Sequence, residues 1–134
     1  MSKDWYLDLK EFQKEVILAN DPEHPCIPDA KCVNIRKMLI KEEIAETLEA
    51  IDNEDLVEIA DGIADSIVVL LGTAVSYGID IRPVWEEVHK TNMTKKGGPV
   101  REDGKRLKPP NWQPPDIKSI IDEQIISKGG YCGN

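Results

Sequence analysis

Apolar side chains recur at helical spacing along much of the 134-residue chain. A first helix is predicted from Trp5, Leu9, Phe12 and Val16, which lie three or four residues apart, and it should end before the Pro-rich stretch 20–28. A second helix, ending near residues 52–53, is predicted from a similar run: Ile35, Met38, Leu39, Ile44, Leu48 and Ile51. No strand pattern stands out, so the sequence predicts an all-α fold of about five helices.

The third helix is predicted from its ends. Asp55 is followed three residues later by Glu58, an arrangement that resembles a capping box and places the N-terminus here. Gly78 is a good residue to follow the last turn, which ends at Tyr77. The helix between them should have about 22 residues and a length of roughly 33 Å.

Two shorter helices are expected after it. Pro83 suits the first position of a fourth helix, which should close near Met93. Asp116 is expected to cap a fifth helix that runs to about Ser127, and the last residues, 129–134, are expected to fray. Between these helices, residues 94–115 contain eight Gly and Pro residues and predict an irregular arm. At roughly 100–200 residues per domain, residues 1–134 should form a single domain.

Apolar residues on the second helix form two stripes on opposite sides. Ile35 and Leu39 are in line with the acids Glu42 and Glu46, whereas a second stripe on the other side contains Ile40, Ile44, Leu48 and Ile51. Five short helices of a small chain do not readily cover a helix on two faces, so we expect a homodimer or higher homo-oligomer to complete the bundle.

The charges are segregated along the chain. Ten acids and no Lys or Arg lie in residues 42–65, whereas residues 82–118 contain nine bases and five acids. The chain as a whole has 25 acids, 17 bases and a net charge of −8, which argues against a nucleic-acid polymer as the partner. This segregation would serve a cation site on the helices and an anion-binding basic arm.

Carboxylates gathered between two neighbouring helices repel one another strongly. At an effective dielectric of ~20, two charges ~4 Å apart repel by about 4 kcal/mol, so the acids must share protons or bind cations. All-oxygen ligation favours Mg²⁺ or Mn²⁺. The alternative is a solvated acidic surface, but the absence of bases and the alignment of acids with apolar stripes argue against it.

Two acidic segments resemble a known signature. KEEIAE at residues 41–46 and EIADGIAD at 58–65 are similar to the EExxE…ExxD pattern of the all-α nucleoside triphosphate pyrophosphohydrolase superfamily, the MazG-like enzymes. Three further segments, VLLGTAVSYGID, EEVHKTNMTKKGG and LKPPNWQPPDI, resemble its phosphoribosyl-ATP pyrophosphohydrolase-like branch, which includes dimeric deoxyuridine triphosphate pyrophosphatases. The resemblance covers roughly residues 35–117.

The resemblance implies roles for individual acids. Glu43, Glu46, Glu58 and Asp61 match the metal-binding quartet, and Glu42 matches the acid proposed to activate water. Asp65 is a candidate further ligand or supporting group, and Glu58 is also a candidate capping residue. The implied reaction is attack of water on the α-phosphorus of a nucleoside triphosphate, which releases nucleoside monophosphate and pyrophosphate.

Substrate-binding roles are implied for the basic half of the chain. Asn92 and Lys95 match an NxxK pattern, in which an amide contacts sugar or base and an ammonium neutralises phosphate. His89 contacts either substrate or a structural partner. Trp112, where the family often has Tyr, stacks on a base or docks the arm. Lys108 and other bases of the arm, Arg101, Lys105 and Arg106, either fold over the triphosphate or remain solvated.

Three functions remain open at this point. The first is metal-dependent nucleoside triphosphate pyrophosphohydrolysis, for example in cleansing the nucleotide pool. The second is phosphoribosyl-ATP hydrolysis in histidine biosynthesis, and the third is a non-catalytic acidic helical module that binds cations or a basic protein. We expect a cytoplasmic protein with no membrane partner, because the N-terminus lacks a secretory h-region and the longest apolar run, 67–75, is far below ~20 residues.

Overall fold

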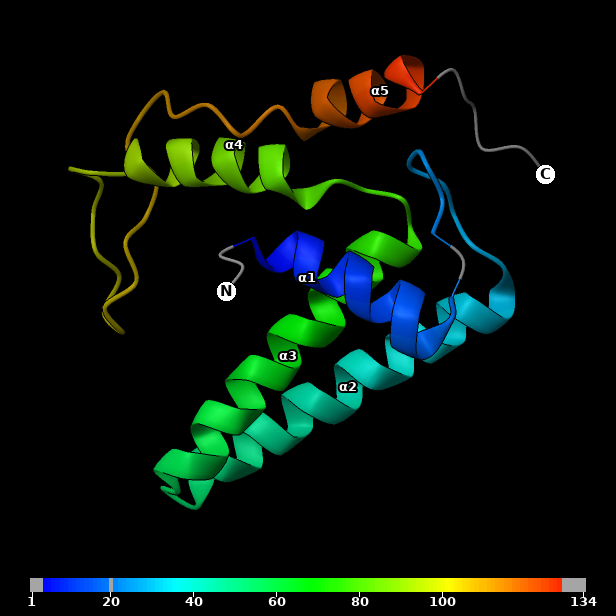
Figure 1. The fold of residues 1–134 in the computed structure, drawn as a ribbon. Helices are drawn as coiled ribbons and strands as arrows, with labels where there is room; N and C mark the ends of the chain where they lie inside the picture. The colour runs from blue at the N-terminus through cyan, green and yellow to red at the C-terminus, as the bar shows by residue number, and fades with distance from the viewer. Residues whose placement is uncertain (1–3, 20, 129–134) are drawn as a thin grey trace.

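The fold is a long helical hairpin that carries shorter helices at its open end (Figure 1). It was obtained as a computed structural model, which describes residues 4–19 and 21–128. The elements are α1 (Trp5–Phe12), the π-helical turn η1 (Gln13–Ile17), α2 (Ala30–Asp52), α3 (Leu56–Ser76), α4 (Ile81–Met93) and α5 (Ile117–Ser127). Within the described residues there is no strand, and an isolated β-bridge joins Val100 to Arg106 in the arm. The all-α prediction is confirmed; the expected fraying of 129–134 concerns residues outside those described.

An aspartate caps the N-terminus of each of the five α-helices. The capping side chains accept backbone N–H bonds from the first turn and belong to Asp4, Asp29, Asp55, Asp80 and Asp116. The predicted caps at Asp55 and Asp116 are therefore confirmed. Gly78 follows α3 with φ +67°, and a Cβ there would lie 2.1 Å from the His24 carbonyl oxygen, so glycine is required.

The first helix ends before residues 20–28, as predicted, but the start predicted for the fourth helix was wrong. The fourth helix begins at Ile81 rather than at Pro83, because Asp80 caps it and accepts the Arg82 N–H. Pro83 is therefore the third helical residue, where its missing N–H still costs no intrahelical bond. The first helix does not stay α-helical to its end: it widens into the π-turn of Gln13–Ile17 and stops at Leu18, whose φ is +59°.

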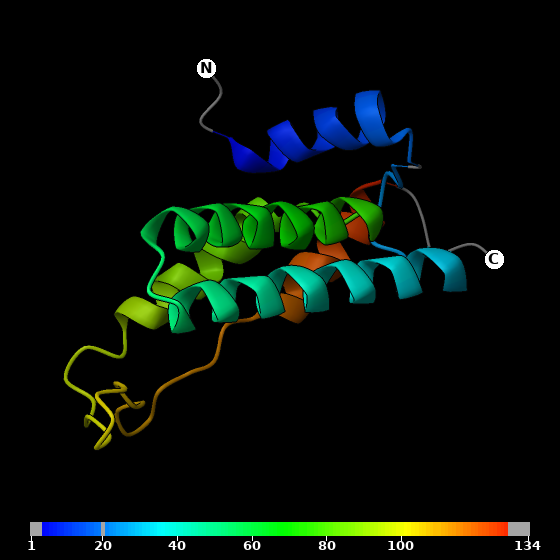
Figure 2. The same cartoon turned by 90° about the horizontal axis from the view of Figure 1, so that it is seen from below.

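Helices α2 and α3 form the main packing unit and run antiparallel (Figures 1 and 2). Gly62 of α3 faces Thr47 of α2 so closely that a Cβ on Gly62 would lie 2.6 Å from Thr47 Oγ1 and 3.1 Å from Thr47 Cα. One turn along, Thr47 Oγ1 lies 3.1 Å from Ser66 Oγ and donates to the Glu43 carbonyl oxygen at 2.7 Å. Small and hydroxyl residues therefore bring the two helix backbones together and fix which residues face each other.

A half-buried arginine joins the N-terminal segment to this hairpin. Arg36 donates to Thr73 Oγ1, to the Val69 carbonyl oxygen and to Gln13 Oε1, at 3.1, 2.7 and 3.3 Å. Gln13, buried in the π-turn, also donates to Ser76 Oγ. Burial lowers the pKa of Arg36. Beside this network, the small apolar core consists of Tyr6, Leu9 and Val75, with Leu71 and Ile81 packed against it.

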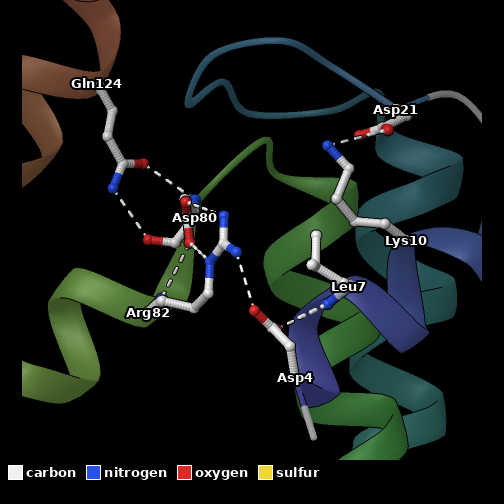
Figure 3. A network of polar contacts seen from close by, with 7 residues as sticks. All are labelled: Asp4, Leu7, Lys10, Asp21, Asp80, Arg82 and Gln124. Atoms are coloured by element: carbon white, nitrogen blue, oxygen red, sulfur yellow. Dashed lines mark hydrogen bonds and ion pairs between the residues drawn. The ribbon is translucent and has the colours of Figure 1, made fainter. Parts of the chain in front are cut away.

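Polar contacts of Asp80 and Arg82 join the turn between α3 and α4 to α1 and α5, and we call these contacts the clasp (Figure 3). Gln124 of α5 contacts both the backbone N–H and the carbonyl oxygen of Asp80, at 3.0 and 2.9 Å. Arg82 forms ion pairs with Asp80 and Asp4, at 2.8 and 2.9 Å, and hydrogen bonding to Arg82 lowers the pKa of Asp80. Burial and nearby acids raise the pKa of Tyr6, beneath Arg82, to about 12.

A cavity of about 660 Å³ opens beside this clasp, but none of the six acids predicted for metal binding or catalysis lines it. Its charged walls neutralise one another, because Lys10 also pairs with Asp21 at 3.4 Å. We therefore treat the clasp as a structural junction that fixes where α4 and α5 leave the hairpin.

Much of the apolar surface of the hairpin lies open in a single chain. Ala50 is the one residue of α2 that is fully buried, whereas Leu48 and Ile51 of the predicted second stripe are 57% and 49% exposed. By length and composition, α3 meets a simple criterion for a membrane span, with mean hydropathy 1.6 and 39% of that window buried. The core helix of a water-soluble protein meets the same criterion, so the location of the protein stays a prediction.

The close approach at Thr47 predicts the effect of adding one methyl group. Gly62→Ala should destabilise the fold by about 1–3 kcal/mol in urea unfolding, because the new Cβ overlaps Thr47. The double variant Thr47→Ala, Gly62→Ala should recover part of this loss. A gain in stability of about 1 kcal/mol in the single variant, as helix propensity alone would give, would contradict the close approach.

Candidate functional site

The hairpin packing brings acids from both helices to one level. Thr47 of α2 faces Ser66 of α3, and near this contact the charges of Glu46 and Asp65 both act on Glu43. Glu43 lies one turn before Thr47, and its carbonyl oxygen accepts the Thr47 hydroxyl. The predicted convergence of carboxylates from the two helices is therefore present for Glu43, Glu46 and Asp65.

Glu43 is the acid most strongly affected by this arrangement. It is half-buried, and its Oε2 atom is buried with no hydrogen-bond partner among the described residues. Burial raises the pKa of Glu43, and the negative charges of Glu46, Asp65 and Glu42 raise it further. A buried, unpartnered carboxylate oxygen among like charges needs either a proton or a cation.

The other two predicted ligands lie nearer the tip of the hairpin. Glu58 and Asp61 are both exposed, and Glu58 belongs to the first turn of α3, where its N–H donates to Asp55. Asp65 is the α3 acid whose charge acts on Glu43. Among residues 4–19 and 21–128, no group of three or more His, Cys, Asp or Glu side chains could hold a metal ion as arranged.

The predicted substrate-binding residues lie elsewhere in the chain. His89 and Asn92 are exposed on α4, and Lys95 follows its last turn. Trp112 docks the arm onto this helix: its Nε1 donates to the Thr91 carbonyl oxygen at 3.1 Å. The ammonium groups of Lys95 and Lys108 lie 5.3 and 4.9 Å from the centre of the indole ring.

Two other bases of the arm have partners inside it. Arg101 pairs with Asp103 at 2.6 Å, and Arg106 donates to the Gly98 carbonyl oxygen, also at 2.6 Å. Together with the bridge from Val100 to Arg106, these contacts give the predicted irregular arm a small hairpin. Sequence reasoning missed this turn, although its signal, Asp103-Gly104 between two extended segments, is present.

A single chain leaves the acids and the α4 residues apart. The extensive helix contacts are those of α2 with α3, α1 with α3 and η1, and α4 with α5. In Figure 1, α4 and α5 lie side by side on the opposite side of α1 from the hairpin tip. No extensive contact therefore joins α4 to α2 or α3, the helices that carry the acids.

The helical fold and a comparison with known families together define the class of the protein. Residues 9–92 match the sequence model of phosphoribosyl-ATP pyrophosphohydrolase, a span that includes α2, α3 and all six acids. This all-helical, MazG-like class consists of hydrolases that act on phosphoric anhydrides. The chain belongs to the phosphoribosyl-ATP pyrophosphohydrolase family. A comparison with curated proteins gave no match.

The raised pKa of Glu43 predicts a pH-dependent stability of the metal-free protein. A carboxyl whose pKa is raised on folding favours the folded state while protonated, and this contribution is lost as pH rises through its folded-state pKa. In EDTA at pH 7.5, Glu43→Gln should therefore raise the melting temperature by roughly 2–4 °C, measured by circular dichroism.

The difference between wild type and Glu43→Gln should shrink as pH falls below the pKa of Glu43, because both side chains are then neutral. Glu49→Gln, an exposed acid on the same helix, is the matched control and should change the melting temperature little. A Glu43→Gln protein that is less stable than wild type at neutral pH would contradict the described environment of Glu43.

Proposed function

We propose that the protein is a metal-dependent pyrophosphohydrolase that cleaves a nucleoside triphosphate between the α- and β-phosphates, releasing nucleoside monophosphate and pyrophosphate. The observation that carries this proposal is the buried, unpartnered Oε2 of Glu43 among the charges of Glu46 and Asp65. Membership of a pyrophosphohydrolase family supports the same reaction class.

The donor set fits a hard divalent cation. Glu43, Glu46 and Asp65 offer only carboxylate oxygens, which favour Mg²⁺ or Mn²⁺. Glu58 and Asp61 precede Asp65 on the same helix, and their side chains would move to complete the set of ligands. When bound, such an ion would neutralise phosphate charge and polarise the phosphoryl group. It would also remove the repulsion that raises the pKa of Glu43.

The remaining roles fall to exposed side chains. Glu42, next to the proposed ligand Glu43 and exposed, would accept a proton from the attacking water. Lys95 and Lys108 would bind the phosphates, whereas Asn92 and His89 would contact the sugar or the base. Because leaving pyrophosphate carries developing negative charge, fixed cations beside it stabilise the transition state.

A homodimer or higher homo-oligomer would bring these parts together. The exposed apolar stripe of α2 and the separation of α4 from the acidic surface both support an active site shared between copies. In that arrangement, the basic surface of one copy would cover the acidic surface of the other. A cytoplasmic location and the absence of membrane or nucleic-acid polymer partners belong to this proposal.

A second candidate substrate is phosphoribosyl-ATP, as in histidine biosynthesis. The specific observation in its favour is the match of residues 9–92 to the family named for that activity. Cleansing of modified or surplus nucleotides remains our first choice. The arm, residues 94–115, lies beyond that match, and its segments resemble a branch that also includes dimeric deoxyuridine triphosphate pyrophosphatases.

We predict that one product assay separates these functions. The full chain with Mg²⁺ or Mn²⁺ should release pyrophosphate from at least one member of a panel of ribonucleoside, deoxynucleoside and oxidised triphosphates. Phosphoribosyl-ATP belongs in the same panel, and faster turnover of it than of every other triphosphate would favour the second candidate. Release of orthophosphate, or of nothing, would contradict the proposal and favour a non-catalytic cation- or protein-binding module.

Three variants assign the roles within this assay. Glu43→Gln and Asp61→Asn should each abolish turnover, by about 100-fold or more, with retained helicity. Glu42→Gln should lose turnover but keep Mn²⁺ affinity; lost affinity would instead make Glu42 a ligand. Glu49→Gln is the control and should stay active.

We predict that a charge in the apolar stripe of α2 dissociates the proposed homo-oligomer. Leu48→Lys places a charge in the exposed apolar stripe of α2 and should shift the molar mass, measured by light scattering, toward the 15.1 kDa of one chain. Asn34→Lys adds the same charge at another exposed position of α2 and is the matched control. A wild-type protein that is monomeric at micromolar concentration would contradict the shared active site.

A further inference from the structure

Two lysines from distant segments meet on one tryptophan ring. Lys95 follows the last turn of α4, Lys108 lies at the far end of the arm, and both ammonium groups lie within 5.3 Å of the centre of the Trp112 ring. Two positive charges from different segments are therefore gathered around one ring.

Two hydrogen bonds to α4 hold the ring and the end of the arm in place. Its Nε1 donates to the Thr91 carbonyl oxygen at the end of α4, which also accepts the backbone N–H and the hydroxyl of Thr94. The end of the arm is tied to the same helix, because the Asp116 N–H donates to Glu87 Oε2 at 2.8 Å. Trp112 is only half-buried and borders an open cleft of about 470 Å³, so it is not a core residue.

The two lysines differ from other bases in their partners. Lys10, Arg82, Arg101 and Lys118 all form ion pairs with aspartates. No ion pair among the described residues involves Lys95 or Lys108, which lie over Trp112. Lys10 and Arg82 also lie over a ring, that of Tyr6, but both are paired with aspartates. A ring attracts an ammonium without neutralising its charge, so both cations stay available to an anion.

We propose that Trp112 is a positioning residue that holds Lys95 and Lys108 together as one anion site for the phosphates of the substrate and for the pyrophosphate product. This inference rests on the proposed function, which it deepens. The family match ends at residue 92, before all three side chains, so the site is carried by the structure of the arm.

The kinetic test compares two replacements of Trp112. Trp112→Phe and Trp112→Leu both lose the hydrogen bond to Thr91, but only Phe keeps an aromatic face. Trp112→Leu should raise KM for the triphosphate on the order of three- to tenfold with little change in kcat, and Trp112→Phe should stay closer to wild type. Equal effects of Leu and Phe would mean that the residue only docks the arm, and would overturn the proposal.

A binding test needs no turnover. In a Trp5→Phe, Trp85→Phe background, Trp112 is the only tryptophan, and inorganic pyrophosphate with Mg²⁺ should change its fluorescence as the ammonium groups shift toward the anion. Lys95→Gln and Lys108→Gln should each weaken this response at least severalfold. Lys96→Gln, an exposed neighbour not over the ring, is the matched control and should not.

The two tests separate this proposal from the proposed function. A fluorescence response that depends on both lysines, without hydrolysis of any triphosphate, would uphold the anion site and overturn the proposed function. Triphosphate hydrolysis with no lysine-dependent response of Trp112 to pyrophosphate would overturn the anion site alone.

Discussion

The close packing of α2 against α3 at Thr47 is the constraint on which the rest of the structure depends. Gly62 has no side chain there because the hydroxyl and Cα of Thr47 occupy the space, and Ser66 meets the Thr47 hydroxyl one turn later. This register sets Glu43 and Glu46 level with Asp65 and leaves one oxygen of Glu43 buried and without a hydrogen bond. A looser crossing would let water separate the acids, and a cation would then gain less by binding.

Helix positions were predictable because their ends are marked locally. Asp55 and Asp116 cap α3 and α5 as their spacing indicates, and the alternation of apolar and acidic positions on α2 and α3 indicates the pair that carries the acids. The start of α4 was predicted wrongly from Pro83, because proline is tolerated throughout the first turn of a helix. The cap at Asp80 sets the start instead. The π-turn at Gln13 follows from tertiary contacts with Arg36 and Ser76, which no local pattern records.

The candidate site was only partly predictable for a related reason. Sequence spacing places several acids on one side of each helix. Which acids of α2 and α3 lie opposite each other depends on the contact between the two helices, and that contact makes Asp65 the α3 neighbour of Glu43. Likewise, the spacing of Lys95, Lys108 and Trp112 along the chain does not reveal that they converge. Their convergence depends on the arm folding back so that Trp112 meets the end of α4.

The helices that carry the acids also leave large apolar side chains exposed, and both features favour association with a second copy. The buried apolar core of one copy is small, centred on Tyr6, Leu9 and Val75, while large apolar side chains of α2 remain near half exposed. Exposed apolar area of this kind favours association. In the proposed homo-oligomer, charges would then select the geometry, because a second copy that offers its basic arm to the acidic surface would relieve like-charge repulsion on both sides. Association driven by the hydrophobic effect would thus assemble the electrostatic site that a single hairpin leaves incomplete.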